Sequence, residues 1–434
     1  MKILALIDHH LGLDSNSFRS LGLFVMALAN YGLMYAANIL LARWLSVGDF
    51  DDYSVAVSIV TMLSTLATLG LEKYALRAVA LLRDREDWQR FRGFWLFALR
   101  SISGFSLLLM VILGVSLEAF LALRQTDVHI AIAVFTGFLP VIAVTLFLVD
   151  VVAAHGAQLL SVTIYRLFLP AVYFVLLIVL SLSPVKVSAL TAVLCFGGAW
   201  TITLAVMWCL AKRLMPTDMK NTTPSMQGKK WLRGSLPLVL NSLLLTVMTS
   251  GGVTILEILF PSDIEVGIYA VAAQTGGIIS LIGTSTNRYY LPMMVVMIGR
   301  GDRHAIRKIM EQRGLAVGST VLILLLILIF AGRAVLGLFG EHFSASYHTM
   351  LIVASGACFS ALFADVPYYL QFMGLHRIVL SLTMVSTVMM VALSFVLGTD
   401  FGSVGVATAY MAAVMLLFIS LRIVAGYHFR RLGG

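Results

Sequence analysis

Residues Leu41–Ala80 read LARWLSVGDFDDYSVAVSIVTMLSTLATLGLEKYALRAVA, and this stretch decides the fold of the chain. It predicts the end of one membrane helix, a short acidic turn and a second long apolar helix. A related pattern returns in PSDIEVGIYAVAAQTGGIISLIGTSTNRYYLP, residues Pro261–Pro292, about half of the 434 residues further on. Five identical residue pairs share one spacing of 216 positions: Tyr53 and Tyr269, Val55 and Val271, Ala56 and Ala272, Ser64 and Ser280, and Thr68 and Thr284. This spacing indicates an internal duplication.

Composition places the chain in the membrane. It is 60% hydrophobic and only 12% charged, with a mean hydropathy of +0.97, whereas soluble proteins are roughly a quarter charged. Apolar runs long enough to cross about 30 Å of hydrocarbon recur along its whole length. The three cysteines all fall inside such runs, without the spacing of a disulfide framework or of metal ligands. We therefore expect an all-α polytopic membrane protein that has no metal or cofactor.

Twelve membrane spans are predicted, with short loops between them. The longest connection, residues 212–233, is polar and basic and contains proline and glycine, as flexible linkers do. We expect an N-terminal six-helix lobe over 1–211, the cytoplasmic linker 212–233 and a C-terminal six-helix lobe over 234–434. The expected spans are about 21–45, 52–82, 93–117, 128–152, 158–183, 187–211, 234–260, 265–298, 308–331, 346–373, 377–398 and 403–428.

Lysine and arginine set the orientation. With the N-terminus inside, the cytoplasmic segments collect 20 lysines and arginines, Arg313 among them, and the opposite face holds 4. Both termini are then cytoplasmic. This asymmetry explains the net charge of +9 through membrane topology, so the basic balance gives no reason to expect a nucleic-acid partner.

The repeat predicts the architecture. Because each half has six spans, equivalent helices point the same way, as in parallel repeats related by an axis along the membrane normal with a substrate path between the halves. Gly156 in AAHGAQ and Gly374 in FMGLHR support the match, since each opens a turn on the cytoplasmic side before the next span. We expect Tyr53 to overlie Tyr269 when the two lobes are superposed.

Several stretches of the sequence resemble a known protein family. The stretch ARWLSVGDFDDYSVAVSIVTMLSTLATLG is similar to the opening signature of the polysaccharide and O-antigen flippases. These belong to the multidrug/oligosaccharidyl-lipid/polysaccharide exporter superfamily. SLPLVLNSLLL, PSDIEVGIYAVAAQ and VLGLFGEHFSASY extend the resemblance through the second half, so that it covers essentially the whole chain. The count of twelve spans departs from the lipid II flippases, which have two more helices, and leaves the drug-exporting branch open.

The resemblance implies the cargo and the partners. It implies two six-helix lobes around a cavity that opens alternately to each side of a bacterial cytoplasmic (inner) membrane. The cargo would be an oligosaccharide linked to undecaprenyl pyrophosphate, moved from the cytoplasmic to the periplasmic leaflet for surface polysaccharide or exopolysaccharide synthesis. Partners would then be the lipid carrier, the membrane lipids and, in the same pathway, a polysaccharide polymerase and glycosyltransferases.

Basic residues within the spans predict where the pyrophosphate binds. A charge at the bilayer centre costs about 3 kcal/mol on insertion scales, so such residues usually line a cavity. We expect Arg166 and Arg288 to face the central cavity and to bridge the lobes through a bound phosphate. For the residues nearer the membrane surface, the alternative is snorkelling toward lipid phosphates, and Arg422 is interpreted as an anchor at the end of the last span. The expected pyrophosphate set is Lys73, Arg77, Arg100, Arg166 and Arg288.

Acidic and aromatic residues add weaker hypotheses. Asp365 is a candidate proton or sodium site, and its structural alternative is bonding the backbone that Pro367 frees. Glu72 is a second candidate for ion coupling, although it can also offset the charge of Lys73. Four tyrosines toward the cytoplasm are candidates for stacking on sugar rings: Tyr289, Tyr290, Tyr368 and Tyr369.

Enzyme functions have no support in the motifs. No loop has room for a glycosyltransferase domain, and no nucleophile-elbow, Walker or HExxH pattern occurs. Three functions remain: a flippase for lipid-linked oligosaccharide, a small-molecule or drug exporter of the same architecture, and a scaffold that transports nothing. A pyrophosphate cargo needs a cationic cavity, whereas a cationic drug needs an acidic one. These charges therefore favour the flippase.

Overall fold

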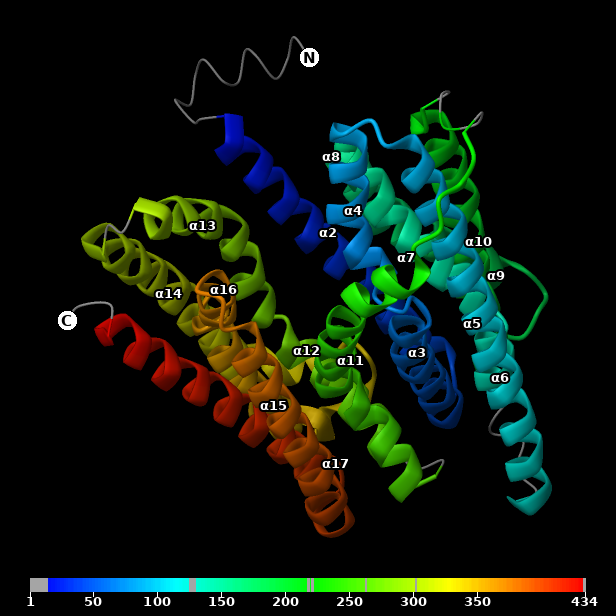
Figure 1. Ribbon diagram of the computed structural model, residues 1–434. Helices are drawn as coiled ribbons and strands as arrows, with labels where there is room; N and C mark the ends of the chain where they lie inside the picture. The colour runs from blue at the N-terminus through cyan, green and yellow to red at the C-terminus, as the bar shows by residue number, and fades with distance from the viewer. Residues whose placement is uncertain are drawn as a thin grey trace. The chain divides into compact units, whose positions relative to one another are not determined.

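The computed structural model describes residues 15–124, 130–216, 219, 222–261, 264–300 and 303–431, and these residues contain helices but no strand. They form two compact units (Figure 1). The first unit takes its described residues from Met1–Gly32, Val271–Met389 and Ala407–Gly434, and the second from Leu33–Ala270 and Met390–Val406. The expected all-α class is confirmed.

The helices follow one another with few residues between them. In chain order they are α2 (Ser15–Trp44), α3 (Val47–Ala67), α4 (Leu71–Asp84), α5 (Trp88–Arg124), α6 (Ile130–Thr136), α7 (Leu139–Val152), η2 (Ala153–Ala157), α8 (Gln158–Thr163), η3 (Ile164–Phe168), α9 (Leu169–Leu182), α10 (Ala189–Leu214), α11 (Gly228–Leu259), α12 (Ile264–Gly277), α13 (Ser280–Arg300), α14 (Arg303–Gly337), η5 (Glu341–Ser346), α15 (Tyr347–Leu362), α16 (Val366–Phe372) and α17 (His376–Arg431).

The number of membrane crossings agrees with twelve. Within the described residues, nine helical stretches are long and apolar enough to span a membrane, and α12 with the start of α13 makes a tenth, bent by 41°. Two of these stretches, Leu139–Leu182 and His376–His428, have 44 and 53 residues, about twice what one crossing needs. Each is interrupted by a glycine with non-helical backbone angles, Gly156 and Gly402. Dividing both stretches brings ten crossings to twelve.

The break between α3 and α4 requires glycine. Gly70 has φ +69°, a conformation that side chains disfavour. A Cβ at this position would lie 2.5 Å from the carbonyl oxygen of Ser235 and 2.8 Å from the backbone nitrogen of Val239, both in α11. The glycine thus lets α11 pack closely against the bend. This bend brings Glu72 and Lys73 to the start of α4.

The two glycines that the repeat paired have the same backbone conformation. Gly156 has φ +89° and Gly374 has φ +81°. Each lies in the left-handed region that turns a chain between helices. The equivalence read from sequence therefore extends to the backbone at these two positions.

In the second unit, α7 packs against α4, α5 and α10, while α3 packs against α11 (Figure 1). Tyr173 of α9 donates a hydrogen bond of 2.9 Å to the hydroxyl of Tyr53 in α3, and both side chains are buried. α10 ends at Leu214 and α11 begins at Gly228, so both helices extend into the residues expected to form the linker. The division into lobes over 1–211 and 234–434 stays a prediction.

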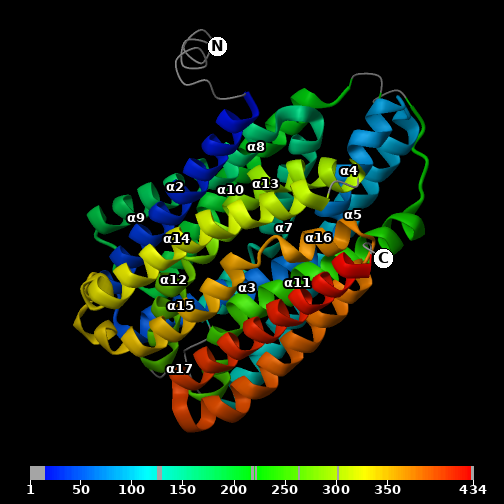
Figure 2. The same cartoon turned by 90° about the vertical axis from the view of Figure 1, so that its left-hand side faces the viewer.

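In the first unit, α14 packs against α13 and α15 (Figure 2). α15 and α16 are separated by a break at residues 363–365, and Pro367 occupies the first turn of α16. Proline fits this turn because its missing N–H would find no partner there. The break leaves backbone carbonyls of residues 361–364 without partners in their own helix. Side chains of α13 and α14 bind three of these carbonyls.

Candidate functional site

One expected pyrophosphate ligand is already ion-paired. Nζ of Lys73, in the first turn of α4, lies 2.8 Å from Oδ2 of Asp150 near the end of α7. The Lys73 side chain is 50% exposed and that of Asp150 is 14% exposed. Glu72, which sequence analysis expected to offset Lys73, is buried, and its Oε2 atom has no hydrogen-bond partner. The carboxylate that contacts Lys73 is therefore Asp150.

Arg166 belongs to the same region of the second unit. It lies in η3, a single π-helical turn between α8 and α9, and is half-buried. The adjacent Tyr165 lies within electrostatic range of Lys73, Asp150 and Arg166. π-Helical turns insert one residue and redirect side chains, and they often occur at functional sites. The fold thus brings Lys73 close to the residue next to Arg166, from two different spans.

Arg77 and Arg100 are exposed. Arg77 lies one turn after Lys73 in α4, and Arg100 lies in α5. Neither forms an ion pair with a carboxylate in the described ranges. The side chains of Arg288 and Tyr289 lie outside the described residues. The proposed set stays a prediction.

Asp365 is held in a buried ion pair that the sequence did not reveal. Nη1 of Arg313, in α14, lies 2.6 Å from Oδ1 of Asp365. The two side chains are 2% and 6% exposed. The count of basic residues placed Arg313 with the cytoplasmic segments, whereas the structure places it inside a candidate membrane span. α14 starts at Arg303, so Arg313 lies almost three turns inside the helix, where its charge needs a partner.

Side chains of two other helices bind the backbone carbonyls at the break before Pro367. Arg313 donates to the carbonyl oxygens of Leu362 at 2.9 Å and Ala361 at 3.3 Å. Nδ2 of Asn287, from α13, donates to the carbonyl oxygen of Ala364 at 2.8 Å. Arg313 and Asn287 therefore bind three backbone carbonyls at the break, while the carbonyl oxygen of Phe363 accepts from the backbone nitrogen of Val366 at 3.1 Å. Asp365 itself neutralises the arginine.

The candidate sugar-stacking tyrosines differ in exposure. Tyr368 is 44% exposed and its neighbour Tyr369 is 2% exposed, while Tyr290 is half-buried. Successive residues of a helix point about 100° apart, so only one member of such a pair can face a given ligand. Sugar contact by any of these tyrosines stays a prediction.

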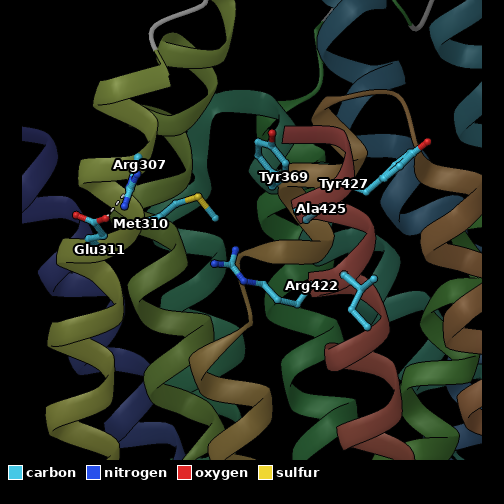
Figure 3. Close-up of a pocket in the computed structure, with 9 residues that line it drawn as sticks. Arg307, Met310, Glu311, Tyr369, Arg422, Ala425 and Tyr427 are labelled. Carbon is cyan, nitrogen blue, oxygen red and sulfur yellow. Dashed lines mark hydrogen bonds and ion pairs between the residues drawn. The ribbon is translucent and has the colours of Figure 1, made fainter. Parts of the chain in front are cut away.

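A cavity of about 940 Å³ lies within the first unit. Arg307, Met310 and Glu311 of α14 form one wall, Arg422 extends toward them from α17, and Tyr369 of α16 closes another side (Figure 3). In the part of the chain that the structure describes, no group of three or more His, Cys, Asp or Glu side chains is placed to hold a metal ion.

Sequence comparison now identifies the family. Residues 20–298 match the family described as polysaccharide biosynthesis protein. The chain belongs to the polysaccharide biosynthesis protein family. No curated protein matches the sequence at a significant level.

Solved structures share the fold of this polysaccharide biosynthesis protein. An inward-facing multidrug resistance MATE family transporter of the MOP superfamily aligns with a TM-score of 0.75 at 13% identity, over 95% of this chain and 99% of the other. The lipid II flippase MurJ in an inward closed conformation gives 0.70 at 11% identity, over 96% and 89%. A MATE transporter of Vibrio cholerae gives 0.61 at 13% identity, over 96% and 98%. At these identities the likeness establishes the fold of a multi-pass membrane transporter.

Two partners in this polysaccharide biosynthesis protein escaped sequence reasoning. Asp150 was not singled out and Arg313 was counted with the cytoplasmic residues, yet each completes an ion pair with a residue that had been singled out, Lys73 or Asp365. The sequence held one signal for both residues. Each is a charged residue within a few residues of an apolar run, and no residue of opposite charge lies three or four positions away on the same helix.

Proposed function

We propose that this protein is a flippase that moves an oligosaccharide linked to undecaprenyl pyrophosphate from the cytoplasmic to the periplasmic leaflet of a bacterial inner membrane. The cargo would serve the synthesis of O-antigen, another surface polysaccharide or exopolysaccharide, and both termini would be cytoplasmic. The protein would act by alternating access and would catalyse no reaction. The family match supports the place in polysaccharide synthesis.

The observation that carries the proposal is the proximity of Lys73 to Tyr165, the residue next to Arg166. Lys73 and Arg166 come from different membrane spans, and Arg77 lies one turn beyond Lys73. A pyrophosphate carries several negative charges, and arginine donates two parallel bonds to phosphate oxygens. We propose Arg166, Lys73, Arg77 and Arg100 as the pyrophosphate-binding residues, and Arg288 as a further member.

Purified protein reconstituted in liposomes provides the test. A fluorescent sugar on a prenyl pyrophosphate is added to the membrane, and its appearance in the other leaflet is followed by quenching with an impermeant reagent. We expect Arg166→Ala to weaken cargo binding roughly 10- to 100-fold, because hydrogen bonds to a charged group contribute about 1.5–3 kcal/mol. Arg166→Lys should restore part of the binding.

Arg333→Ala is the matched control. Arg333 is also an arginine in a membrane helix, but it stacks on Tyr347 with its guanidinium carbon 4.9 Å from the ring centroid. Its removal should leave cargo binding unchanged. Cargo binding by Arg166→Ala as tight as that of the unmodified protein would contradict the proposed site.

A drug exporter is the main alternative, because MATE transporters share the fold. The same liposomes separate the two functions. Movement of a cationic dye without movement of the prenyl-pyrophosphate sugar would favour the exporter and overturn the flippase. The expected result is the reverse.

A further inference from the structure

None of the residues that line the cavity between α14, α16 and α17 belongs to the proposed pyrophosphate set. It carries three charged groups. Arg307 and Glu311 form an ion pair with Nε 2.8 Å from Oε1, one helical turn apart on α14. Arg422 reaches in from the opposite wall (Figure 3) and has no ion-paired carboxylate within 4 Å among the described residues. The lining therefore has a net charge of one positive unit.

The nearest buried carboxylate does not cancel that charge. Asp365 lies within electrostatic range of Arg422, but its negative charge is already neutralised by Arg313 at 2.6 Å. A carboxylate that is already in a salt bridge attracts a further cation such as Arg422 only weakly, because the positive charge of its partner opposes its own negative charge. Arg422 thus remains available to a singly charged anion.

The cavity is at the level of lipid headgroups. Arg307 lies in the polar first turns of α14, before the apolar part that begins at Gly314. Arg422 lies nine residues before the end of α17 at Arg431, which is about 14 Å along a helix. One helix begins and the other ends here, so both arginines lie near the same edge of the membrane. Lipid phosphates occupy this depth.

An apolar stripe leads away from the cavity along α17. Leu416, Ile419, Ile423 and Tyr427 are all exposed, and their spacing of three or four residues puts them on one face of the helix. Ile423 and Tyr427 also line the cavity itself. A site with a cation at the phosphate level and an apolar track toward the membrane centre matches a lipid better than a soluble anion.

We propose that this cavity binds the headgroup of an anionic phospholipid, a phosphodiester with one negative charge. The guanidinium of Arg422 donates to the phosphate oxygens, and an acyl chain lies along Ile423, Ile419 and Leu416. Glu311 lowers the affinity by its own charge and by holding Arg307. The site is independent of the proposed cargo site and would be present whichever cargo the transporter carries.

The experiment uses the full-length protein, purified in detergent and stripped of lipid. Phosphatidylglycerol, phosphatidylcholine and soluble glycerol phosphate are added separately, and bound molecules are counted by native mass spectrometry alongside the shift in melting temperature. We expect phosphatidylglycerol to bind at least tenfold more tightly than phosphatidylcholine. Glycerol phosphate has the phosphate without the acyl chains and should bind far more weakly.

Four variants locate the site. Arg422→Gln should weaken phosphatidylglycerol binding roughly tenfold or more, whereas Arg377→Gln, an equal loss of charge at an exposed position of the same helix, should leave it unchanged. Glu311→Gln should strengthen binding several-fold, since it adds one positive unit to the lining. Gly426→Leu should weaken it: nothing lies within 4 Å of a Cβ at Gly426, so the new side chain fits and fills cavity space.

The signs of these effects decide the proposal. Equal losses in Arg422→Gln and Arg377→Gln would mean that any surface cation attracts the lipid, and the cavity would not be a site. Glycerol phosphate binding as tightly as phosphatidylglycerol would identify a soluble-anion site and would overturn the lipid. Either outcome would leave the flippase proposal intact, because the proposed cargo site includes Arg166 and does not include Arg422.

Discussion

Nζ of Lys73 lies 2.8 Å from Oδ2 of Asp150, across 77 residues of sequence and between two different membrane spans. One member of the proposed pyrophosphate set therefore already holds an anion. An arriving phosphate must compete with this carboxylate for the ammonium group. The ion pair sets how strongly Lys73 attracts its ligand.

Replacing Asp150 with Asn should strengthen cargo binding. Exposed ion pairs are worth about 0.2–1 kcal/mol, and the Lys73 side chain is half-exposed, so the gain should be roughly two- to fivefold in Kd. Equilibrium binding of a prenyl-pyrophosphate sugar measures it. Asp84→Asn, at an exposed position of α4, is the control that changes net charge alone. Weaker binding in Asp150→Asn than in the control would contradict a competing role.

Replacing Asp365 with Asn should destabilise the protein. The change leaves the buried guanidinium of Arg313 without its counter-charge, and breaking one side of a buried ion pair costs about 3–5 kcal/mol. The melting temperature in detergent should fall, and Arg313→Gln added to Asp365→Asn should recover part of the loss. An unchanged melting temperature together with loss of gradient-driven transport would instead support Asp365 as the ion-coupling carboxylate expected from sequence.

Asn287 provides a related test of the break between α15 and α16. Asn287→Ala removes the donor to the carbonyl oxygen of Ala364, and an unsatisfied buried carbonyl costs about 1–3 kcal/mol. Hydrogen–deuterium exchange in residues 363–372 should accelerate more than exchange elsewhere in the first unit. Thr286→Ala is the matched control, because the Thr286 hydroxyl bonds only within its own helix. Equal exchange in both variants would show that this bond does not hold the break.

Gly70→Ala should lower stability by several kcal/mol. The new Cβ would meet the backbone of α11 at 2.5 and 2.8 Å, and the φ of +69° adds strain of its own. Gly104→Ala in α5 should have the opposite sign, since nothing lies within 4 Å of its Cβ and alanine favours helix by about 1 kcal/mol. Thermal unfolding of the two variants in one detergent compares them directly. Similar melting temperatures would show that the bend is not closely packed.

The fold was largely predictable because its signals are local. Bilayer thickness sets the length of each apolar run, and helix is the structure that satisfies its backbone in lipid. The paired positions of Gly156 and Gly374 could be matched because a left-handed turn restricts the residue type. These features depend only on residues that are close together in the sequence, so they can be read from a single chain.

The ion pairs were not predictable for the opposite reason. Arg313 and Asp365 are 52 residues apart on different helices, and no periodicity within either helix reports which face meets the other. Arg313 follows several basic residues at the start of α14, so its charge appeared to belong to the surface. Arg422 likewise appeared to be an anchor at a helix end, since the opposite wall of its cavity lies more than 100 residues earlier in the chain.

The separation of Arg313 and Asp365 also matters while the protein is being made. A ribosome adds about 5–20 residues per second, so the 52 residues between them take roughly 3–10 s to synthesise. During that interval the arginine of α14 has no carboxylate to meet. It lies near the end of its span from which its long side chain can reach the headgroup region. The ion pair between Arg313 and Asp365 can therefore form only after α16 has been made, later than α14 itself.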